Sequence, residues 1–193
     1  GTPGIYAIDG GGQASLVSAT AAEDLQFAPD GSLYAANSSG IYAIDEQTGA
    51  AAQVSSNPTS QFVFEGANSV VTTNGSAYQS TFARRTDRIN LITDSTTLVN
   101  GDGGEDIKFE GGEVLLCGQG GIFRILPSGA FSNIRSGRTF NFGVGSLGDF
   151  YIGNSASYGG ISWAPQGLYA PSMSPTALYS PDVNALVVTD ACE

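Results

Sequence analysis

The sequence predicts an all-β fold, a five-bladed β-propeller of four-stranded antiparallel blades whose ring is closed by pairing N-terminal with C-terminal strands. Three observations predict this fold class. A short apolar motif recurs roughly every 40 residues, strand-like runs alternate with Gly, Asp and Asn turns, and no segment shows a sustained helical period. The 193 residues are enough for one domain with a buried core.

The clearest repeat is Gly-Ile-Tyr-Ala-Ile-Asp, which stands at residues 4–9 and again at residues 40–45. A weaker copy, Gly-Ile-Phe-Arg-Ile, occupies residues 121–125, and a remnant, Gly-Ile-Ser-Trp, occupies residues 160–163. We expect a degenerate copy at residues 77–82. Because β-branched and aromatic residues favour strands, the motif predicts one strand, the third, in each blade.

A second set of segments precedes these copies and predicts the first strand of each blade: residues 25–27, 62–64, 107–109, 140–142 and 177–179. When they are aligned, the last column reads Phe, Phe, Phe, Phe, Tyr. Aromatic side chains bury large apolar areas, so we expect this column to pack between neighbouring sheets.

Turn residues followed by apolar runs predict the second strands. Pro-Asp-Gly precedes residues 32–36, Gly-Gly precedes residues 114–117, and Pro-Asp-Val-Asn precedes residues 185–189. A weaker run such as residues 52–54 then predicts the fourth, outer strand.

The phase of the repeat predicts how the ring closes. The chain begins with strands three and four of a blade, at residues 4–17, and ends with strands one and two, at residues 176–190. Pairing of these two halves completes a fifth blade and leaves no open blade interface. We therefore expect residues 1–193 to form a single domain and a monomer.

Charge and composition exclude some partners. The net charge of −11 disfavours nucleic acid and anionic membrane surfaces, which bind basic faces. No apolar run reaches the ~20 residues that span a bilayer. The low lysine count and two Asn-x-Ser sequons, at Asn37 and Asn74, favour an extracellular location. A glycan or a protein is the expected partner.

Residues 25–37 (Leu-Gln-Phe-Ala-Pro-Asp-Gly-Ser-Leu-Tyr-Ala-Ala-Asn), followed by residues 40–45, resemble the NHL and SMP-30-like group of propeller repeats. At the level of repeats the resemblance covers nearly the whole chain. It implies the propeller fold and a ligand site at the rim where the first strands begin. Members of the group include sugar-lactone hydrolases, lyases and binding platforms, so the resemblance does not assign one activity.

This rim and the inner strands supply the candidate ligand-binding residues, Asp24, Gln26, Gln61, Asp106, Lys108 and Asn141. Asp24 and Asp106 are the candidate ligands of a calcium ion, because Ca²⁺ prefers oxygen donors. Two structural interpretations stay open. Lys108 pairs with one of these aspartates and plugs the channel, or the whole column packs between blades.

Catalytic chemistry has little support, since the chain has no histidine and no recognised catalytic motif. The leading hypothesis is an extracellular, non-enzymatic binding module of the lectin-like or protein-interaction kind. The first alternative is a metal-assisted hydrolase or lyase of the SMP-30-like type, with its cation at Asp24 and Asp106. The second is a structural domain of a larger surface protein.

The two cysteines, Cys117 and Cys192, form a candidate disulfide, because an even count in a secreted chain favours pairing. The predicted topology puts them at one rim but in non-adjacent blades. The bond therefore requires the tail to cross the rim, and the sequence leaves open whether it forms.

Overall fold

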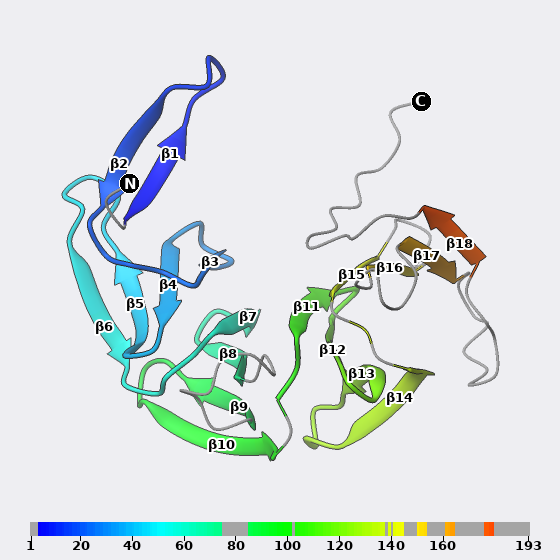
Figure 1. Ribbon diagram of the computed structural model, residues 1–193. Coiled ribbons are helices and arrows are strands. Elements are labelled where there is room, and N and C mark those ends of the chain that lie inside the picture. The colour runs from blue at the N-terminus through cyan, green and yellow to red at the C-terminus, as the bar shows by residue number, and fades with distance from the viewer. Residues whose placement is uncertain are drawn as a thin grey trace. The chain divides into compact units, whose positions relative to one another are not determined.

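The computed structural model describes residues 4–74, 85–101, 103–137, 139, 141–144, 150–153, 161–164 and 176–179 (Figure 1). The regular secondary structure of these residues is β-strand, which confirms the predicted all-β class. None of them belongs to a helix long and apolar enough to cross a membrane. The chain divides into two compact units, Gly1–Asp102 and Gly103–Glu193.

The first complete sheet of unit 1 is a meander of β3 (Asp24–Phe27), β4 (Leu33–Asn37), β5 (Gly40–Ile44) and β6 (Ala51–Ser55). Its first turn follows from the Pro-Asp-Gly sequence: the Asp30 carboxylate accepts the Ser32 N–H at 2.9 Å, and Gly31 takes a positive φ of 86°. The predicted order of four strands is confirmed for this sheet.

The second sheet of unit 1 contains β7 (Gln61–Gly66), β8 (Ser69–Asn74), β9 (Arg85–Asn90) and β10 (Ser95–Asn100), again as a meander. The third strand expected at residues 77–82 lies outside the described residues, and Arg85–Asn90 occupies the third position instead. Its pattern Arg-Thr-Asp-Arg-Ile-Asn does not resemble the motif, because this strand buries polar groups such as Thr86 and Asp87.

Unit 2 holds a third sheet, formed by β11 (Asp106–Glu110), β12 (Glu113–Gly118), β13 (Gly121–Ile125) and β14 (Phe131–Ser136). A fourth sheet contains β15 (Asn141–Val144), β16 (Phe150–Gly153), β17 (Ile161–Ala164) and β18 (Thr176–Tyr179). All neighbouring strands in both sheets are antiparallel, as expected for blade-like repeats.

The structure differs from the prediction at the C-terminal end. Residues 176–179 were expected to open the closing blade, but β18 pairs with β17 as the outer strand of the fourth sheet. This pairing satisfies the backbone groups along the otherwise open edge of β17. Residues 180–190 lie outside the described residues, so closure of a ring stays a prediction.

The N-terminal strands β1 (Ile5–Ile8) and β2 (Ala14–Ser18) form a two-stranded antiparallel hairpin. Their pairing matches that of the third and fourth strands elsewhere: Ile5↔Ser18 corresponds to Ile41↔Ser55 and Ile122↔Arg135, with a register shift after each isoleucine. The hairpin thus shares the register of the third and fourth strands of the complete sheets, while its place in a closing blade stays a prediction.

The glycine of the repeated motif is required by a close backbone approach. Gly40 and Gly121 open β5 and β13 with φ angles of 137° and 129°. A Cβ at Gly40 would lie 2.0 Å from the Ser55 carbonyl oxygen, and one at Gly121 would lie 1.7 Å from that of Arg135. Only glycine fits there, so the motif records a tight approach of the third and fourth strands.

The predicted aromatic column is buried only in part. Phe64 is 7% exposed and packs edge to face with Tyr34, at 5.1 Å between ring centroids. Phe27 and Phe109, in the same column, are 65% and 41% exposed, so the prediction of a uniformly packed column is wrong. Full burial belongs instead to Phe62 and Phe142.

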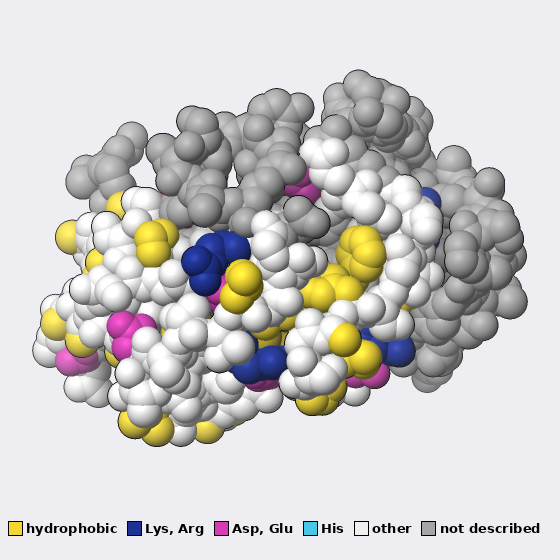
Figure 2. Space-filling view, turned by 90° about the horizontal axis from the view of Figure 1, so that it is seen from below, with side chains coloured by type: hydrophobic (Ala, Val, Ile, Leu, Met, Phe, Trp, Pro, Cys, Tyr) yellow, Lys and Arg dark blue, Asp and Glu magenta, His cyan; other side chains and the backbone are white. Residues whose placement is uncertain are grey.

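Ion pairs neutralise four of the basic side chains: Arg85–Asp87, Arg88–Glu65, Lys108–Asp106 and Arg124–Glu113. The face in Figure 2 accordingly shows basic side chains next to acidic ones, with apolar side chains reaching the surface between them. Four of the five basic side chains among the described residues therefore have a carboxylate partner.

Candidate functional site

Asp24 joins two sheets of unit 1. Its carboxylate accepts the backbone N–H of Phe62, in the next sheet, at 2.9 Å and that of Leu25 at 2.9 Å. The Gln26 amide lies 3.5 Å from both carboxylate oxygens. Gln61 immediately precedes Phe62, so three of the predicted site residues meet at the junction of β3 and β7.

Asp106 makes the same contact in unit 2. Its Oδ2 atom accepts the N–H of Phe142, at the start of β15, at 3.4 Å. The ammonium of Lys108 lies 3.4 Å from the same oxygen, which is the ion pair that the sequence left open. Burial raises the pKa of Asp106, against the opposing effects of Lys108 and the Phe142 N–H.

Lys108 is placed between a carboxylate and an aromatic ring. Its Nζ atom lies 5.7 Å from the centroid of the Phe142 ring, and its side chain is 30% exposed. Among the described residues, it is the basic side chain on the first strand of a four-stranded sheet. The position of Lys108 is therefore fixed by two contacts. Its ammonium group has three N–H donors, and the ion pair with Asp106 does not use all of them.

Asn141 opens β15, next to the residue that Asp106 contacts. Side chains alternate along a strand, so Asn141 faces away from Phe142. Its Oδ1 atom is buried and has no hydrogen-bond donor in the described part of the molecule. Asp106, Lys108 and Asn141 thus share the junction of β11 and β15, with Asn141 directed to the far side of β15.

Equivalent backbone hydrogen bonds hold the segments that lead into β7 and β15. The N–H of Thr59 donates to the Asn37 carbonyl at 3.0 Å, and the N–H of Thr139 donates to the Gly118 carbonyl at 3.0 Å. Both threonines are fully buried. This equivalence aligns Phe142 with Phe62, so the predicted alignment of residues 140–142 was wrong by two positions.

The candidate calcium ligands belong to separate units, Asp24 to the first and Asp106 to the second. Each carboxylate already accepts a backbone N–H from a neighbouring strand. The described residues contain no group of three or more His, Cys, Asp or Glu side chains arranged to hold a metal ion. Calcium binding at Asp24 and Asp106 stays an untested hypothesis of the sequence analysis.

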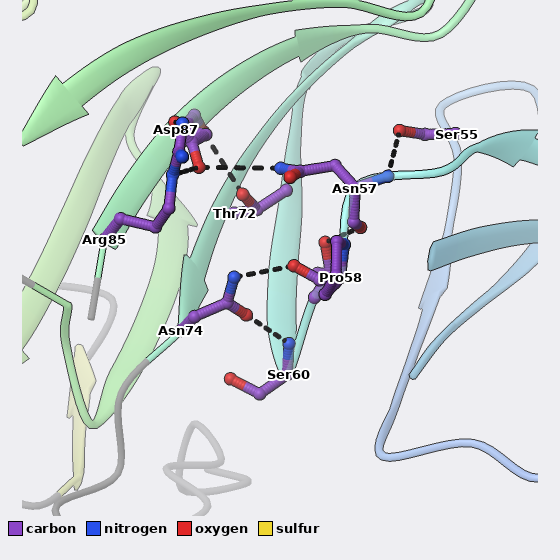
Figure 3. Close-up of polar contacts among 9 residues, drawn as sticks. Ser55, Asn57, Pro58, Ser60, Thr72, Asn74, Arg85 and Asp87 are labelled. Carbon is purple, nitrogen blue, oxygen red and sulfur yellow. Dashed lines mark hydrogen bonds and ion pairs between the residues drawn. The ribbon is translucent and has the colours of Figure 1, made fainter. Parts of the chain in front are cut away.

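A buried polar network in unit 1 was missed by the sequence analysis (Figure 3). Asp87 is fully buried on β9, and its carboxylate contacts both Nε and Nη2 of Arg85, the latter at 2.5 Å. The Asn57 amide reaches the same carboxylate at 3.5 Å. These contacts tie the segment before β7 to β9. The signal in the sequence was an alternating Arg-x-Asp pair inside a strand.

The two sequon asparagines have structural partners. Asn37 donates from Nδ2 to the Ala21 carbonyl at 2.8 Å, and Asn74 donates from Nδ2 to the Pro58 carbonyl at 2.6 Å. Asn74 is buried and also accepts the Ser60 N–H at 2.8 Å (Figure 3). Each asparagine is the last residue of the second strand of its sheet. Each holds in place the segment that leads into the first strand of the same sheet.

Cys117 lies on β12, opposite Asp106, and is fully buried. Burial, together with the negative charge of Asp106, raises the pKa of its thiol well above the usual value. No disulfide joins Cys117 to another described residue. Cys192 lies outside the described residues, so the bond between them stays a prediction.

No protein-family model and no curated protein sequence matches this chain. The structure is similar to the extracellular domain of BT3049 from B. thetaiotaomicron, assigned as a hybrid two-component system, with a TM-score of 0.69 and 12% identity over 94% of this chain. It is also similar to the extracellular domain of BT4673 from B. thetaiotaomicron, assigned as a one-component system, with a TM-score of 0.60 and 11% identity over 84% of this chain.

A third similar structure is TolB from Acinetobacter baumannii, with a TM-score of 0.55 and 14% identity over 82% of this chain. The chain spans 26%, 25% and 45% of the lengths of these three structures, in the order given. At these identities the likeness is one of fold.

Proposed function

We propose that this chain is an extracellular, non-enzymatic binding domain, built as a five-bladed β-propeller, that binds a glycan through the junction of β11 and β15. The extracellular location is supported by the similar fold of two bacterial extracellular domains. The five-bladed ring is supported by the repeated four-stranded sheets and by the hairpin β1–β2, which corresponds to half of one.

The observation that carries this proposal is the position of Lys108. It lies on the first strand of its sheet, pairs with Asp106 at 3.4 Å and is 30% exposed. A partly exposed cation beside a carboxylate offers a hydroxyl-rich ligand both donors and an acceptor. The Phe142 ring lies beside the same ammonium group, so the ligand would meet a pre-ordered side chain.

The test compares two substitutions that each remove one positive charge. Fluorescently labelled wild-type protein, Lys108→Met and Arg124→Met are applied to a glycan array, and the best glycan is then titrated by calorimetry. Arg124 is the matched control, because it lies on β13, two strands away from Lys108 in the same sheet, and has its own carboxylate partner in Glu113. We expect Lys108→Met to weaken binding by about tenfold or more, since a lost hydrogen bond to a charged group costs about 1.5–3 kcal/mol.

Equal losses in Lys108→Met and Arg124→Met would show a general charge effect and contradict the assigned site. Failure of the wild-type protein to bind any glycan at millimolar concentration would contradict the glycan. In that case the protein-interaction hypothesis would be tested with the same pair of variants.

A further inference from the structure

Arg135, on β14, is the basic side chain among the described residues that has no carboxylate within ion-pair distance in that part of the chain. Its Nε atom is buried and has no hydrogen-bond acceptor there. Its Nη1 atom donates to the Thr139 hydroxyl oxygen at 3.3 Å, and this hydroxyl donates in turn to the Gly137 carbonyl at 3.2 Å. The guanidinium is therefore held by a neutral group, and its positive charge is not compensated.

The repeat has a small hydroxyl residue at the position that Arg135 occupies. The fourth-strand residue opposite the third-strand isoleucine is Ser18 in the hairpin, Ser55 on β6 and Arg135 on β14. Ser18 and Ser55 are 2% and 1% exposed. Residues that lie opposite each other in an antiparallel pair share a face of the sheet. Packing of the sheets therefore requires no charge at this position.

The sheet that follows supplies a carboxylate near this position in unit 1 but not in unit 2. In unit 1 the Asn57 amide, two residues after the serine of β6, donates to Asp87 at 3.5 Å. Asp87 belongs to the row of paired residues that begins at Phe62 and crosses β8 to β9. The equivalent row in unit 2 begins at Phe142 and reaches Ser162 on β17. An uncharged residue thus stands where unit 1 has its carboxylate.

The surroundings of Arg135 make an uncompensated charge costly. Ile122, directly opposite, is fully buried in an apolar cluster with Ile134 and Phe142. Burial accordingly lowers the pKa of Arg135. A partly desolvated cation without a counter-ion destabilises a fold, and a guanidinium offers a planar fork of donors that matches the oxygens of carboxylate, sulfate and phosphate groups. These features favour an anionic ligand from outside the chain.

We propose that Arg135 binds an oxyanion, the carboxylate, sulfate or phosphate group of a small ligand, through guanidinium donors that Thr139 leaves unused. This site is separate from the proposed glycan site at Lys108 and does not rest on it. Asp106 and Arg135 stand at opposite ends of one row of paired residues across the four strands. The two residues between them, Cys117 and Ile122, are fully buried.

The test compares full-length wild-type protein with Arg135→Met and Arg124→Met. Methionine keeps an apolar stem and removes the charge. Arg124 is the matched control, because it lies on the neighbouring strand β13 and has its own partner in Glu113. Acetate, sulfate and inorganic phosphate are titrated separately by calorimetry at constant ionic strength. We expect one or more of them to bind the wild-type protein and Arg124→Met, and to bind Arg135→Met at least about tenfold more weakly, since charge-assisted bidentate hydrogen bonds are among the strongest. The anion that binds identifies the chemical group of the ligand.

Thermal unfolding gives a second readout that a purely structural arginine would not produce. In chloride buffer Arg135→Met should melt at the wild-type temperature or above it, because the variant no longer buries an uncompensated charge. The bound anion should raise the melting temperature of the wild-type protein and of Arg124→Met but not that of Arg135→Met.

Three results would overturn the proposal. The first is that none of the three anions binds the wild-type protein, and the second is that both variants lose binding equally. The third is that Arg135→Met melts well below the wild-type protein in chloride, which would mean that the guanidinium already has an anionic partner in the chain. None of these measurements uses a glycan, so failure here is distinguishable from failure of the proposed function.

Discussion

The two aspartate contacts at Asp24 and Asp106 show one structural role in two different settings. Each carboxylate opens the first strand of a sheet and accepts the N–H of a phenylalanine on the next, Phe62 or Phe142. Two residues further on, the strands differ: unit 1 has the neutral Gln26, and unit 2 has Lys108.

This difference shows which part of the repeat is constrained. At both places the aspartate binds the backbone of the next sheet, so its recurrence reflects assembly of the sheets. The residue two positions further on makes no such backbone contact, and it differs between the two strands. A charge placed at this variable position, as at Lys108, is therefore a better indication of binding than the aspartates themselves.

The largest expected effect separates the two contacts. Asp106→Ala leaves the Lys108 ammonium and the Phe142 N–H without their shared acceptor, and breaking a largely buried ion pair costs about 3–5 kcal/mol. Asp24→Ala removes hydrogen bonds that neutral backbone N–H groups donate to the carboxylate, which costs about 1–3 kcal/mol. Urea unfolding of the two variants measures both free energies. Equal losses would mean that Lys108 contributes nothing to this contact.

The second-largest expected effect is on the pH dependence of stability, which should differ between the wild-type protein and Asp106→Asn. Burial raises the pKa of Asp106 in the folded protein, so folding disfavours its ionised form. Stability from this group is present below the unfolded pKa and is lost as pH rises through the folded pKa. The loss is about 1.4 kcal/mol for each pH unit that separates the folded from the unfolded pKa. Relative to Asp106→Asn, the wild-type protein should therefore lose stability as pH rises from about 3 to about 7. Parallel curves in urea titrations at several pH values would contradict this.

Most strands could be predicted from the sequence because the repeated residues are ones that the backbone geometry requires. Gly40 and Gly121 are fixed by contacts that exclude a Cβ, so the motif is readable at both places. Strand β9 was not predicted, because Thr86 and Asp87 are buried polar residues whose partners come from other segments. The role of residues 176–179 was misassigned, since a short apolar run suits an inner or an outer strand equally well.

The candidate site was predicted as a set of residues and not as an arrangement. The sequence analysis proposed Asp24 and Asp106 as ligands of one ion, which stays untested, and it did not predict that each accepts an N–H from a neighbouring strand. The pairing of Lys108 with Asp106 was foreseen as one alternative because the two alternate along one strand. The orphaned Asn141 Oδ1 depends on the packing of side chains from several strands, which no local pattern encodes.

A smaller effect is expected at the exposed ion pair of unit 2. The Glu113 and Arg124 side chains are 45% and 32% exposed, with Nε and Oε2 2.6 Å apart. Solvent and salt screen such pairs, so Glu113→Gln should change the free energy of unfolding by about 0.5 kcal/mol or less. Thermal unfolding at low and high salt provides the measurement. A loss comparable to that of Asp106→Ala would show that exposure does not distinguish the two pairs.

The smallest expected effect is that of calcium. The Asp24 and Asp106 carboxylates each accept a backbone N–H, so a metal ion at either would have to compete with a contact that joins two sheets. We therefore expect EDTA to leave the melting temperature unchanged and calcium titration to release no heat. Tight binding with a large loss of stability in EDTA would reverse this and favour the metal-assisted enzyme. Asp24→Asn combined with Asp106→Asn would then decide the site, because only a metal held by these carboxylates would be lost in a protein that still folds.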